Sequence, residues 1–253
     1  YIDSQGRYEV AGYHGYWPTD PLAVDPRIGG GDALHALIEA AHARGIRVLM
    51  DLVANHVHED HPYYTQHPTW FNDGCVCGTA DCDWTARRLD CLFRPYMPDV
   101  NWQKTEASEQ FIEDSLTWLE RYDLDGFRID AVKHVEDLAI LNLGVRVREA
   151  FQTAGTRYFL MGETAMGWDS SSGPYDGGNG ENYDTISRYI GPNALDGQFD
   201  FVLYYAASLQ FLNDEPGRGM AHIDFWSQAS MERYPPEAIM TPYIGSHDVP
   251  RFI

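Results

Sequence analysis

The apolar residues of this chain follow two spacings that alternate along it. Helical spacing predicts helices over residues 32–45, 105–122, 138–151 and 219–232, and apolar runs predict strands over residues 46–51, 126–130, 157–163, 197–205 and 237–248. Strands that alternate with helices are typical of βαβ units, whose strands form a parallel sheet. The alternation therefore predicts an α/β protein built on a parallel sheet.

Two of the predicted helices carry an apolar stripe that should face the core. The stripes comprise Leu34, Leu37, Ile38 and Ala41 in the first helix and Ile112, Leu116 and Leu119 in the second. Two segments interrupt the regular pattern, and we expect both to be irregular: residues 56–104 and a glycine-rich loop over residues 173–180.

The segment "GFRIDAVKH", residues 126–134, places two charged residues on one face of a predicted strand. Successive side chains of a strand point to opposite faces, so Phe127 and Ile129 should face a packing layer while Arg128 and Asp130 share the other face. For this segment alone, an exposed ion pair on a surface strand is the simplest interpretation. In a functional site, Arg128 would instead keep Asp130 ionised and oriented.

Polar residues recur where the predicted strands end. They are Asp51, Asp130, Glu163, His247 and Asp248. In a (β/α)-barrel such residues converge on one face, which is where active sites lie. An open doubly wound sheet also binds ligands at its strand ends, but the glycines of "IGGGDALH", residues 28–35, do not follow a strand as a phosphate-binding loop requires. We therefore expect a barrel.

Three carboxylates at three strand ends, Asp130, Glu163 and Asp248, suit cleavage of a glycosidic bond. One carboxylate would act as nucleophile, one as general acid and then base, and one would support the positive charge of the transition state. Glu163 follows the apolar segment "YFLMG", and burial there would raise its pKa as a general acid requires.

All four cysteines lie in one window, at Cys75, Cys77, Cys82 and Cys91. The spacing lacks a C-x-x-C pair and the window contains no histidine, so two disulfides are favoured over a zinc site. A bridge between Cys75 and Cys77 would be strained by its small loop, so each of these two is expected to pair with Cys82 or Cys91. Disulfides indicate an oxidising compartment, which predicts a secreted, extracellular or periplasmic protein.

The chain has 18 Lys and Arg against 38 Asp and Glu, a formal net charge of −20. Such a surface repels phosphate backbones and anionic lipids, which argues against nucleic-acid and membrane partners. No apolar run is long enough to span a bilayer. A neutral substrate or a cation is the more compatible ligand.

Four segments resemble the signature regions of the α-amylase family of glycoside hydrolases, and they occur in the order of that family. They are "DLVANH" (51–56), "GFRIDAVKH" (126–134), "MGET" (161–164) and "IGSHD" (244–248). "AGYHGYWPTD" (11–20) and "MPDVNW" (97–102) resemble two further family segments. The resemblance, which is closest to the α-amylases proper, covers almost the whole chain. It implies a (β/α)8 barrel of TIM type, incomplete in this chain, with an irregular insertion after the third barrel strand.

The resemblance implies a role for each matching residue. Asp130 matches the nucleophile, Glu163 the acid/base and Asp248 the transition-state stabiliser. The residues matching those that bind or flank the sugar at the cleavage point are His14, Tyr16, Trp17, His56, Arg128 and His247. Lys133 and His134 match a pair on the leaving-group side that is typical of α-amylases and cyclodextrin glucanotransferases.

The resemblance also implies a structural calcium ion. Asn55, Asp99 and the backbone carbonyl of His134 match its ligands, and a carbonyl near Leu89 is a further candidate. Ligands that offer only oxygen suit calcium. The alternative is that Asn55 and Asp99 merely satisfy backbone groups in their loops.

Two departures from the family pattern stand out. Ser246 precedes His247 where the family usually has Asn, which affects how that loop is held. The first strands and the last strand and helices of the barrel are lacking, so we expect this chain to be the middle of a longer enzyme. Its predicted organisation is a partial catalytic barrel, residues 1–55 and 105–253, and a cysteine-containing insertion domain, residues 56–104.

The function implied is retaining hydrolysis of internal α-1,4 bonds in starch- or glycogen-type glucans by a monomeric enzyme. The alternatives are a glucan transferase of the same family, forming cyclic or transferred glucans, and a catalytically silent α-glucan-binding relative. The product profile from soluble starch would discriminate among the three.

Overall fold

The centre of the molecule is a parallel sheet of four strands. In the computed structural model, which describes residues 9–152, 155, 157–213 and 216–249, the strand order is β1-β4-β5-β6. The strands are β1 (Leu49–Val53), β4 (Gly126–Asp130), β5 (Phe159–Gly162) and β6 (Gly197–Gln198). All three pairings are parallel, as the alternation of strands and helices predicts. Four parallel strands are consistent with an incomplete (β/α)8 barrel.

The register of the sheet brings the catalytic candidates to one edge. Val53 pairs with Asp130, and Ile129 pairs with Gly162, so Glu163 directly follows the paired part of β5. The Glu163 amide nitrogen donates to the Ile129 carbonyl at 2.9 Å. Because parallel strands run the same way, Asp130 and Glu163 emerge side by side at the carboxyl edge.

Side chains of β4 alternate as predicted. Phe127 and Ile129 are fully buried in the main core. The side chains of Arg128 and Asp130, on the other face, are only 12% and 13% exposed. The interpretation of this strand as a surface element with an exposed ion pair is therefore wrong, since both charged groups lie within the molecule.

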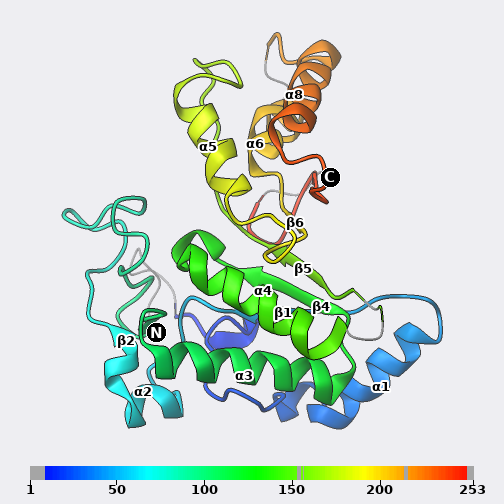
Figure 1. The fold of residues 1–253 in the computed structure, drawn as a ribbon. Helices are drawn as coiled ribbons and strands as arrows, with labels where there is room; N and C mark the ends of the chain where they lie inside the picture. The colour runs from blue at the N-terminus through cyan, green and yellow to red at the C-terminus, as the bar shows by residue number, and fades with distance from the viewer. Residues whose placement is uncertain (1–8, 153–154, 156, 214–215, 250–253) are drawn as a thin grey trace.

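Three long helices pack alongside the sheet: α1 (Gly30–His42), α3 (Thr105–Tyr122) and α4 (Asp137–Phe151) (Figure 1). Ile112 and Leu119 of α3 are fully buried, as predicted. In α1, Ile38 is buried, but Leu37 is 61% exposed and does not belong to the inward stripe. The helix turns about 100° per residue, so its apolar face toward the core is narrower than the sequence run suggested.

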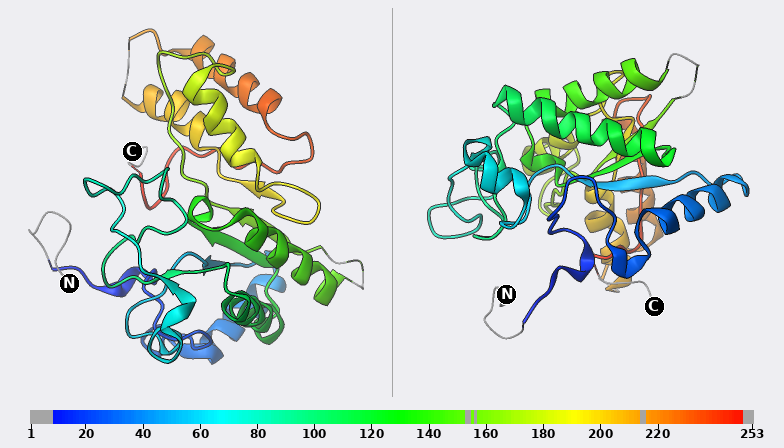
Figure 2. Two further views of the ribbon diagram at one scale, coloured as in Figure 1. Left: turned by 60° about the vertical axis from the view of Figure 1, so that its left-hand side comes forward. Right: turned by 90° about the horizontal axis from the view of Figure 1, so that it is seen from below.

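Residues 56–104 are irregular, as expected, and all of them are described (Figure 2). They contain α2 (Pro62–Gln66), the 3-10 turn η3 (Pro68–Trp70) and the antiparallel pair β2 (Phe71–Asn72) and β3 (Asp99–Val100). None of these elements joins the parallel sheet. We refer to residues 56–104 as the insertion.

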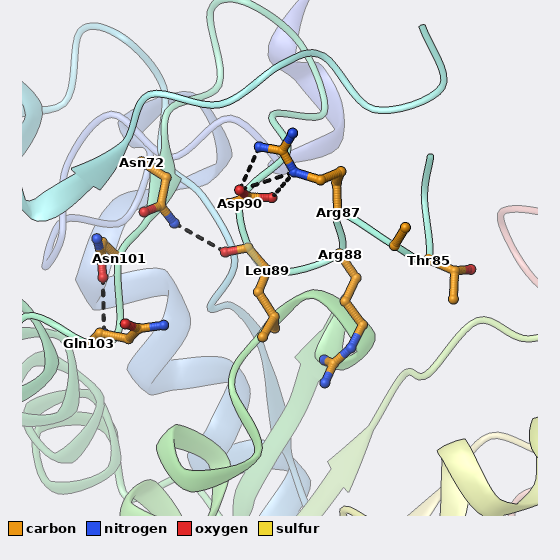
Figure 3. Close-up of a pocket in the computed structure, with 9 residues that line it drawn as sticks. Asn72, Thr85, Arg87, Arg88, Leu89, Asp90, Asn101 and Gln103 are labelled. Carbon is orange, nitrogen blue, oxygen red and sulfur yellow. Dashed lines mark hydrogen bonds and ion pairs between the residues drawn. The ribbon is translucent and has the colours of Figure 1, made fainter. Parts of the chain in front are cut away.

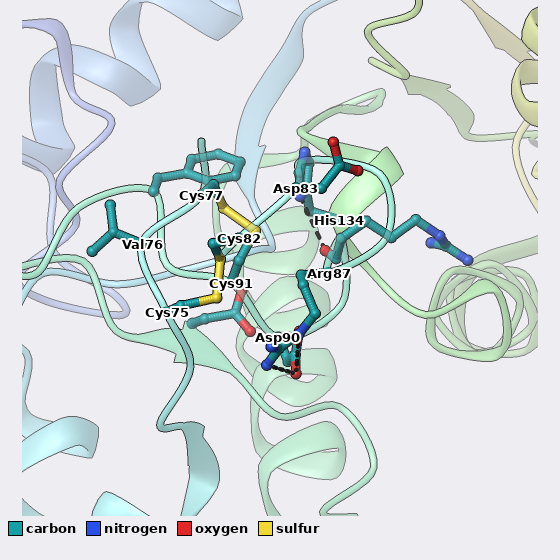
Figure 4. The surroundings of a disulfide bond; sticks show 12 residues. Cys75, Val76, Cys77, Cys82, Asp83, Arg87, Asp90, Cys91 and His134 are labelled. Carbon is teal, nitrogen blue, oxygen red and sulfur yellow. Dashed lines mark hydrogen bonds and ion pairs between the residues drawn. A yellow bond between two sulfur atoms is a disulfide. The ribbon is translucent and has the colours of Figure 1, made fainter. Parts of the chain in front are cut away.

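Two disulfides staple the insertion, Cys75–Cys82 and Cys77–Cys91 (Figure 4). This confirms the prediction of two bridges and selects one of the two pairings left open. Sulfur atoms of Cys77 and Cys91 lie within 4.8 Å of a ring nitrogen of His134, but both are already bonded to each other. Since all four cysteines are bridged, they offer no thiolate to a zinc ion.

A second group of helices follows β5 and packs around its own core (Figure 1). It comprises α5 (Gly177–Ser187), α6 (Phe201–Leu203), the π-helix η6 (Tyr204–Ser208), α7 (Leu209–Leu212) and α8 (Met220–Arg233). Tyr183 of α5, Val202 of α6 and Trp226 of α8 are buried there. The remaining short turns are η1 (Gly12–His14), η2 (Pro26–Ile28) and η4 (Val132–His134).

Three predictions in this half of the chain were wrong: the strand over residues 197–205, the extent of the glycine-rich loop, and the strand over residues 237–248. The predicted strand over 197–205 ends at Gln198 and gives way to helix, because the Asp200 side chain accepts from the Leu203 amide and starts a helix there. An apolar run of this length does not by itself distinguish a strand from a buried helix. The glycine-rich loop ends earlier than expected, since α5 begins at Gly177.

The segment 237–248 forms no regular strand. It runs beside β6, where Thr241 makes an isolated parallel bridge with Phe199. Pro242 follows immediately and has no N–H to continue the ladder, so regular pairing stops there. Within the described residues, no helix is both long and apolar enough to cross a bilayer.

Candidate active site

A cleft of ≈ 460 Å³ opens at the carboxyl edge of the sheet. The three predicted catalytic carboxylates, Asp130, Glu163 and Asp248, all line it. The predicted substrate contacts that line it are Tyr16, His56, Lys133, His134 and His247. Residues from five separate parts of the chain thus meet in one cleft.

Arg128 does not itself line the cleft, but it contacts two of the carboxyl groups that do. Its Nη1 lies 2.7 Å from Asp51 Oδ1 and 2.6 Å from Asp130 Oδ1, and its Nη2 lies 2.9 Å from Glu163 Oε2. One guanidinium therefore joins Asp51, in the middle of β1, to the carboxyl ends of β4 and β5. The strand predicted to end at Asp51 continues to Val53. Because arginine stays protonated and donates in a rigid plane, it fixes the orientation of all three carboxyl groups.

Both central carboxyl groups have raised pKa values. Burial, opposed by the charge of Arg128 and assisted by the nearby Asp130, raises the pKa of Glu163 to about 7. Burial also raises the pKa of Asp130, while Arg128 and a hydrogen bond from Glu163 lower it. The raised pKa of Glu163 suits a general acid, while the two contacts from Arg128 oppose protonation of Asp130.

Tyr16 closes one wall of the cleft. Its hydroxyl donates to Asp51 Oδ2 at 2.7 Å and lies 3.2 Å from His247 Nε2, and its ring stacks on that of His247 with centroids 5.7 Å apart. Asp51 accepts from both Tyr16 and Arg128, so it orients these two neighbours. Burial raises the pKa of Tyr16, which keeps its hydroxyl protonated.

The backbone of Tyr16 is held by hydrogen bonds to His14 and His56, and Trp17 packs against His14. The Tyr16 amide donates to His14 Nδ1 at 3.0 Å, and the rings of His14 and Trp17 meet edge to face at 4.9 Å. The ring nitrogen Nε2 of His56 donates to the Tyr16 carbonyl at 2.9 Å. Burial lowers the pKa of His56 to about 4, so it is neutral at pH 7. Of these three, only His56 also lines the cleft.

Asp248 and His247 sit on the segment that follows the bridge at Thr241. His247 Nε2 lies 3.0 Å from Asp248 Oδ2. The hydroxyl of Ser246, which stands where the family usually has Asn, accepts from the Asp248 amide at 3.2 Å. The serine therefore supplies a local turn contact that holds this loop.

Lys133 and His134 occupy the short turn η4, just after β4. Lys133 Nζ lies 3.3 Å from Thr85 Oγ1, and His134 Nδ1 donates to the Arg88 carbonyl at 3.0 Å. Burial lowers the pKa of His134 to about 4, so its ring is neutral. Both residues are thus held from the insertion side of the cleft.

The predicted calcium ligands also converge. Asn55 and Asp99 are each 1% exposed, and one terminal atom of the Asn55 amide lies 3.1 Å from the His134 carbonyl oxygen and 3.2 Å from Asp99 Oδ1. Either this atom is the nitrogen and donates to both, or it is the oxygen and three oxygens face a common centre. Asn72 donates to Asp99 Oδ2 at 2.7 Å and to the Leu89 carbonyl at 3.1 Å, which places that carbonyl beside the same cluster. This oxygen set fits calcium.

Sequence reasoning missed five residues that line the cleft, the two alanines Ala131 and Ala165 and three large apolar side chains, Trp84, Phe93 and Met97. Phe93 meets the ring of His134 edge to face at 4.8 Å, and Trp84 does so at 5.7 Å. Trp84 remains 42% exposed. The sequence feature that could have identified the three apolar side chains is their position near the cysteines, because the disulfides hold the loop that carries them.

Known proteins resemble this chain along most of its length. Residues 4–74 and 80–253 match the family model described as Alpha amylase, catalytic domain. A cyclomaltodextrinase from Bacillus sp. is 25% identical over 256 residues, covering 95% of this chain and 40% of that protein. A cyclomaltodextrin glucanotransferase from Bacillus sp. (strain 1-1) is 29% identical over 142 residues, covering 49% of this chain and 20% of that protein.

A solved structure agrees with the fold. The crystal structure of an α-amylase from Anoxybacillus superposes with a TM-score of 0.76 at 25% identity, over 95% of this chain and 48% of that one. The chain spans less than half the length of each of these three proteins. With a family model matched over almost all of its residues, a parallel sheet and carboxylates at its strand ends, this chain belongs to the α-amylase family of glycoside hydrolases.

Proposed function

We propose that this protein hydrolyses internal α-1,4-glucosidic bonds of starch- or glycogen-type glucans with retention of the anomeric configuration. The observation that carries the proposal is the pair Asp130 and Glu163 held by the one guanidinium of Arg128, with the pKa of Glu163 raised to about 7. A retaining mechanism requires one ionised carboxylate as nucleophile and one protonated carboxyl group as general acid.

Retention is supported by the closeness of the two carboxyl groups. Asp130 Oδ1 and Glu163 Oε2 lie 2.6 Å and 2.9 Å from the two terminal nitrogens of the same guanidinium, that of Arg128. An inverting enzyme needs roughly 6.5–9.5 Å between its carboxyl groups to admit a water molecule, whereas a retaining one needs roughly 5–5.5 Å. Two carboxyl groups held by one guanidinium favour the shorter separation.

In the first step, the Asp130 carboxylate attacks the anomeric carbon while Glu163 gives its proton to the glycosidic oxygen. The bond between that oxygen and the anomeric carbon breaks, and a glycosyl ester of Asp130 forms. In the second step, the Glu163 carboxylate takes a proton from water, which attacks the anomeric carbon and releases Asp130. Asp248, on the rim of the cleft, supports the positive charge that develops on the sugar in both steps.

We assign sugar binding at the cleavage point to Tyr16, His56, Arg128 and His247, with His14 and Trp17 behind Tyr16. Lys133 and His134 serve the leaving-group side. All of these residues come from one chain, so the site needs no second copy, in keeping with a monomer. We also propose secretion or export to the periplasm, since both disulfides are formed and require an oxidising compartment.

We further propose that Asn55, Asp99 and the His134 carbonyl, with the Leu89 carbonyl beside them, hold a structural calcium ion. These residues belong to the exit of β1, to the insertion and to the loop after β4. A cation there would neutralise the buried Asp99 carboxylate and tie the insertion to the barrel. The proposed role of the calcium ion is to stabilise the fold.

A second candidate is a glucan transferase, favoured by the similarity to a cyclomaltodextrin glucanotransferase. The two reactions share the glycosyl ester and differ in whether water or a sugar hydroxyl attacks it. Chromatography of the products from soluble starch separates them: linear oligosaccharides of several lengths support hydrolysis, and cyclic or elongated products support transfer. If starch and cyclic maltooligosaccharides both stay intact, the protein is a silent glucan-binding relative and the proposal fails.

A further inference from the structure

Arg88, in the insertion, reaches across to three other segments of the molecule. Its Nη1 donates to the Lys133 carbonyl at 2.9 Å and to the Tyr189 hydroxyl at 3.1 Å, and its Nη2 lies 3.5 Å from Asp137 Oδ1. These partners belong to the turn after β4, to the segment after α5 and to the first residue of α4. The Arg88 side chain is only 19% exposed.

The same residue also holds the second member of the leaving-group pair. Its carbonyl oxygen accepts from His134 Nδ1 at 3.0 Å. Arg88 therefore contacts Lys133 through its side chain and His134 through its backbone. Among the described residues of the insertion, no other makes hydrogen bonds to both members of this pair.

The turn that carries Lys133 and His134 needs such support. Ala131, which precedes it, has φ of 50°, a left-handed conformation that is unfavourable for a residue with a side chain. The turn itself spans only Val132–His134 and is too short to stabilise itself. At its start it is fixed to β5, because the Val132 amide donates to the Glu163 carbonyl at 2.8 Å. At its far side, the Lys133 carbonyl is fixed by Arg88.

Arg87 is a natural comparison for Arg88. In Figure 3 the two neighbouring side chains point in opposite directions, and Arg87 turns toward Asp90. The Arg87 side chain is 43% exposed, and its ion pair with Asp90 stays within the insertion. Adjacent arginines thus make a local contact in one case and a contact between segments in the other.

We propose that Arg88 is a positioning residue for the leaving-group side of the cleft. By fixing the Lys133 carbonyl against Tyr189 and Asp137, it sets the direction in which Lys133 and His134 meet the departing part of the glucan. The proposal rests on the proposed function for the cleft itself. It adds a determinant that lies outside the cleft lining and acts through the residues it holds.

The test compares two substrates in the full-length protein, in excess calcium. In a 4-nitrophenyl α-maltooligoside cleaved at its aryl bond, the leaving group is no sugar and needs little from Lys133 and His134. In maltoheptaose or soluble starch, the leaving group is a glucosyl chain. Arg88→Met is expected to lower kcat/KM on the glucan by about tenfold, as a small misplacement does, and to leave cleavage of the aryl bond within about twofold.

Matched variants separate positioning from stability. Arg87→Met should leave both activities unchanged. Arg88→Lys keeps the charge but loses the planar fork, so it should recover part of the glucan activity, and Tyr189→Phe should show a smaller loss of the same kind. If Arg88→Met does not fold, Arg88→Lys and Tyr189→Phe still test the proposal.

The outcomes are distinguishable. If Arg88→Met lowers both activities equally with a fall in Tm, or changes neither, Arg88 is not a positioning residue for the leaving group. If the unmodified protein cleaves neither substrate, the proposed function of the cleft is what fails. A loss confined to the glucan supports the inference.

Discussion

Arg128 and Glu163 form an ion pair of 2.9 Å between Nη2 and Oε2, across the ends of neighbouring strands β4 and β5. The same guanidinium holds Asp130 at 2.6 Å. The proposed acid and the proposed nucleophile therefore share one counter-ion. Their protonation is set jointly, which has consequences that can be measured.

The first measurable consequence is the pH dependence of activity. Glu163 must carry a proton to act as general acid, and its pKa is raised to about 7, so kcat/KM should fall as pH rises through about 7. Asp130 must be ionised, and burial raises its pKa above the ordinary value, so activity should also fall on the acidic side. A bell-shaped profile with its alkaline limb near pH 7 is expected. An alkaline limb several units higher would contradict the assignment of Glu163.

Removal of the shared counter-ion should move this profile. Arg128 lowers the pKa of both carboxyl groups, so Arg128→Met should shift both limbs to higher pH by on the order of 1 unit. It should also lower kcat/KM by about 10²-fold or more, because Asp130 loses its orientation. Arg146→Met, which breaks an ion pair with Glu109 between α4 and α3, is the control and should leave the profile in place.

Substitution of the two carboxylates should separate their roles. Asp130→Asn should abolish turnover on all glucosides, because no ester can form. Glu163→Gln should lower kcat on starch by about 10²–10⁴-fold but spare the first step with aryl glycosides whose leaving group needs no proton. Both variants should unfold at nearly the temperature of the unmodified protein, and Glu39→Gln, on the exposed side of α1, should be silent. Wild-type activity in either site variant would remove it from the mechanism.

Chelation tests the calcium proposal. If Asn55, Asp99 and the His134 carbonyl bind an ion only in the folded state, its removal should cost about 3 kcal/mol when calcium had been present at roughly 100 times its Kd. Activity should fall together with Tm and return when calcium is restored. Asp99→Asn should show the loss without chelator, whereas Asp73→Asn, an exposed position in the insertion, should not. Metal analysis that finds no calcium, with no effect of chelator, would refute the site.

Reduction of the disulfides should loosen the insertion. Each bridge is expected to contribute about 2–3 kcal/mol, with the larger share from Cys77–Cys91, because it closes the longer loop. Thiol titration should find no free thiol among the four cysteines before reduction and four afterwards. Replacement of Cys77 and Cys91 together by serine should lower Tm more than the same change at Cys75 and Cys82. The reverse order would show that loop closure does not govern the stability of this region.

Much of the fold could be predicted because it depends on local periodicity. The bounds of α3 and β4 follow from the spacing of apolar residues and agree with the structure. The apolar run after Gln198 was misassigned, because its helix depends on a capping contact at Asp200 and on packing against α8. Such contacts produce no periodic pattern of apolar residues in the sequence.

The sequence by itself pointed to the three carboxylates for which we propose catalytic roles, since Asp130, Glu163 and Asp248 stand in recognisable segments at predicted strand ends, and the structure brings them into one cleft. It also determined that four clustered cysteines form two bridges. Only the tertiary structure decided which cysteines pair, that Trp84 and Phe93 face the cleft, and that Arg88 rather than Arg87 reaches Lys133. The physical reason is that strand ends are brought together by the regular geometry of a parallel sheet. The path of an irregular loop is instead fixed by contacts between residues far apart in the chain.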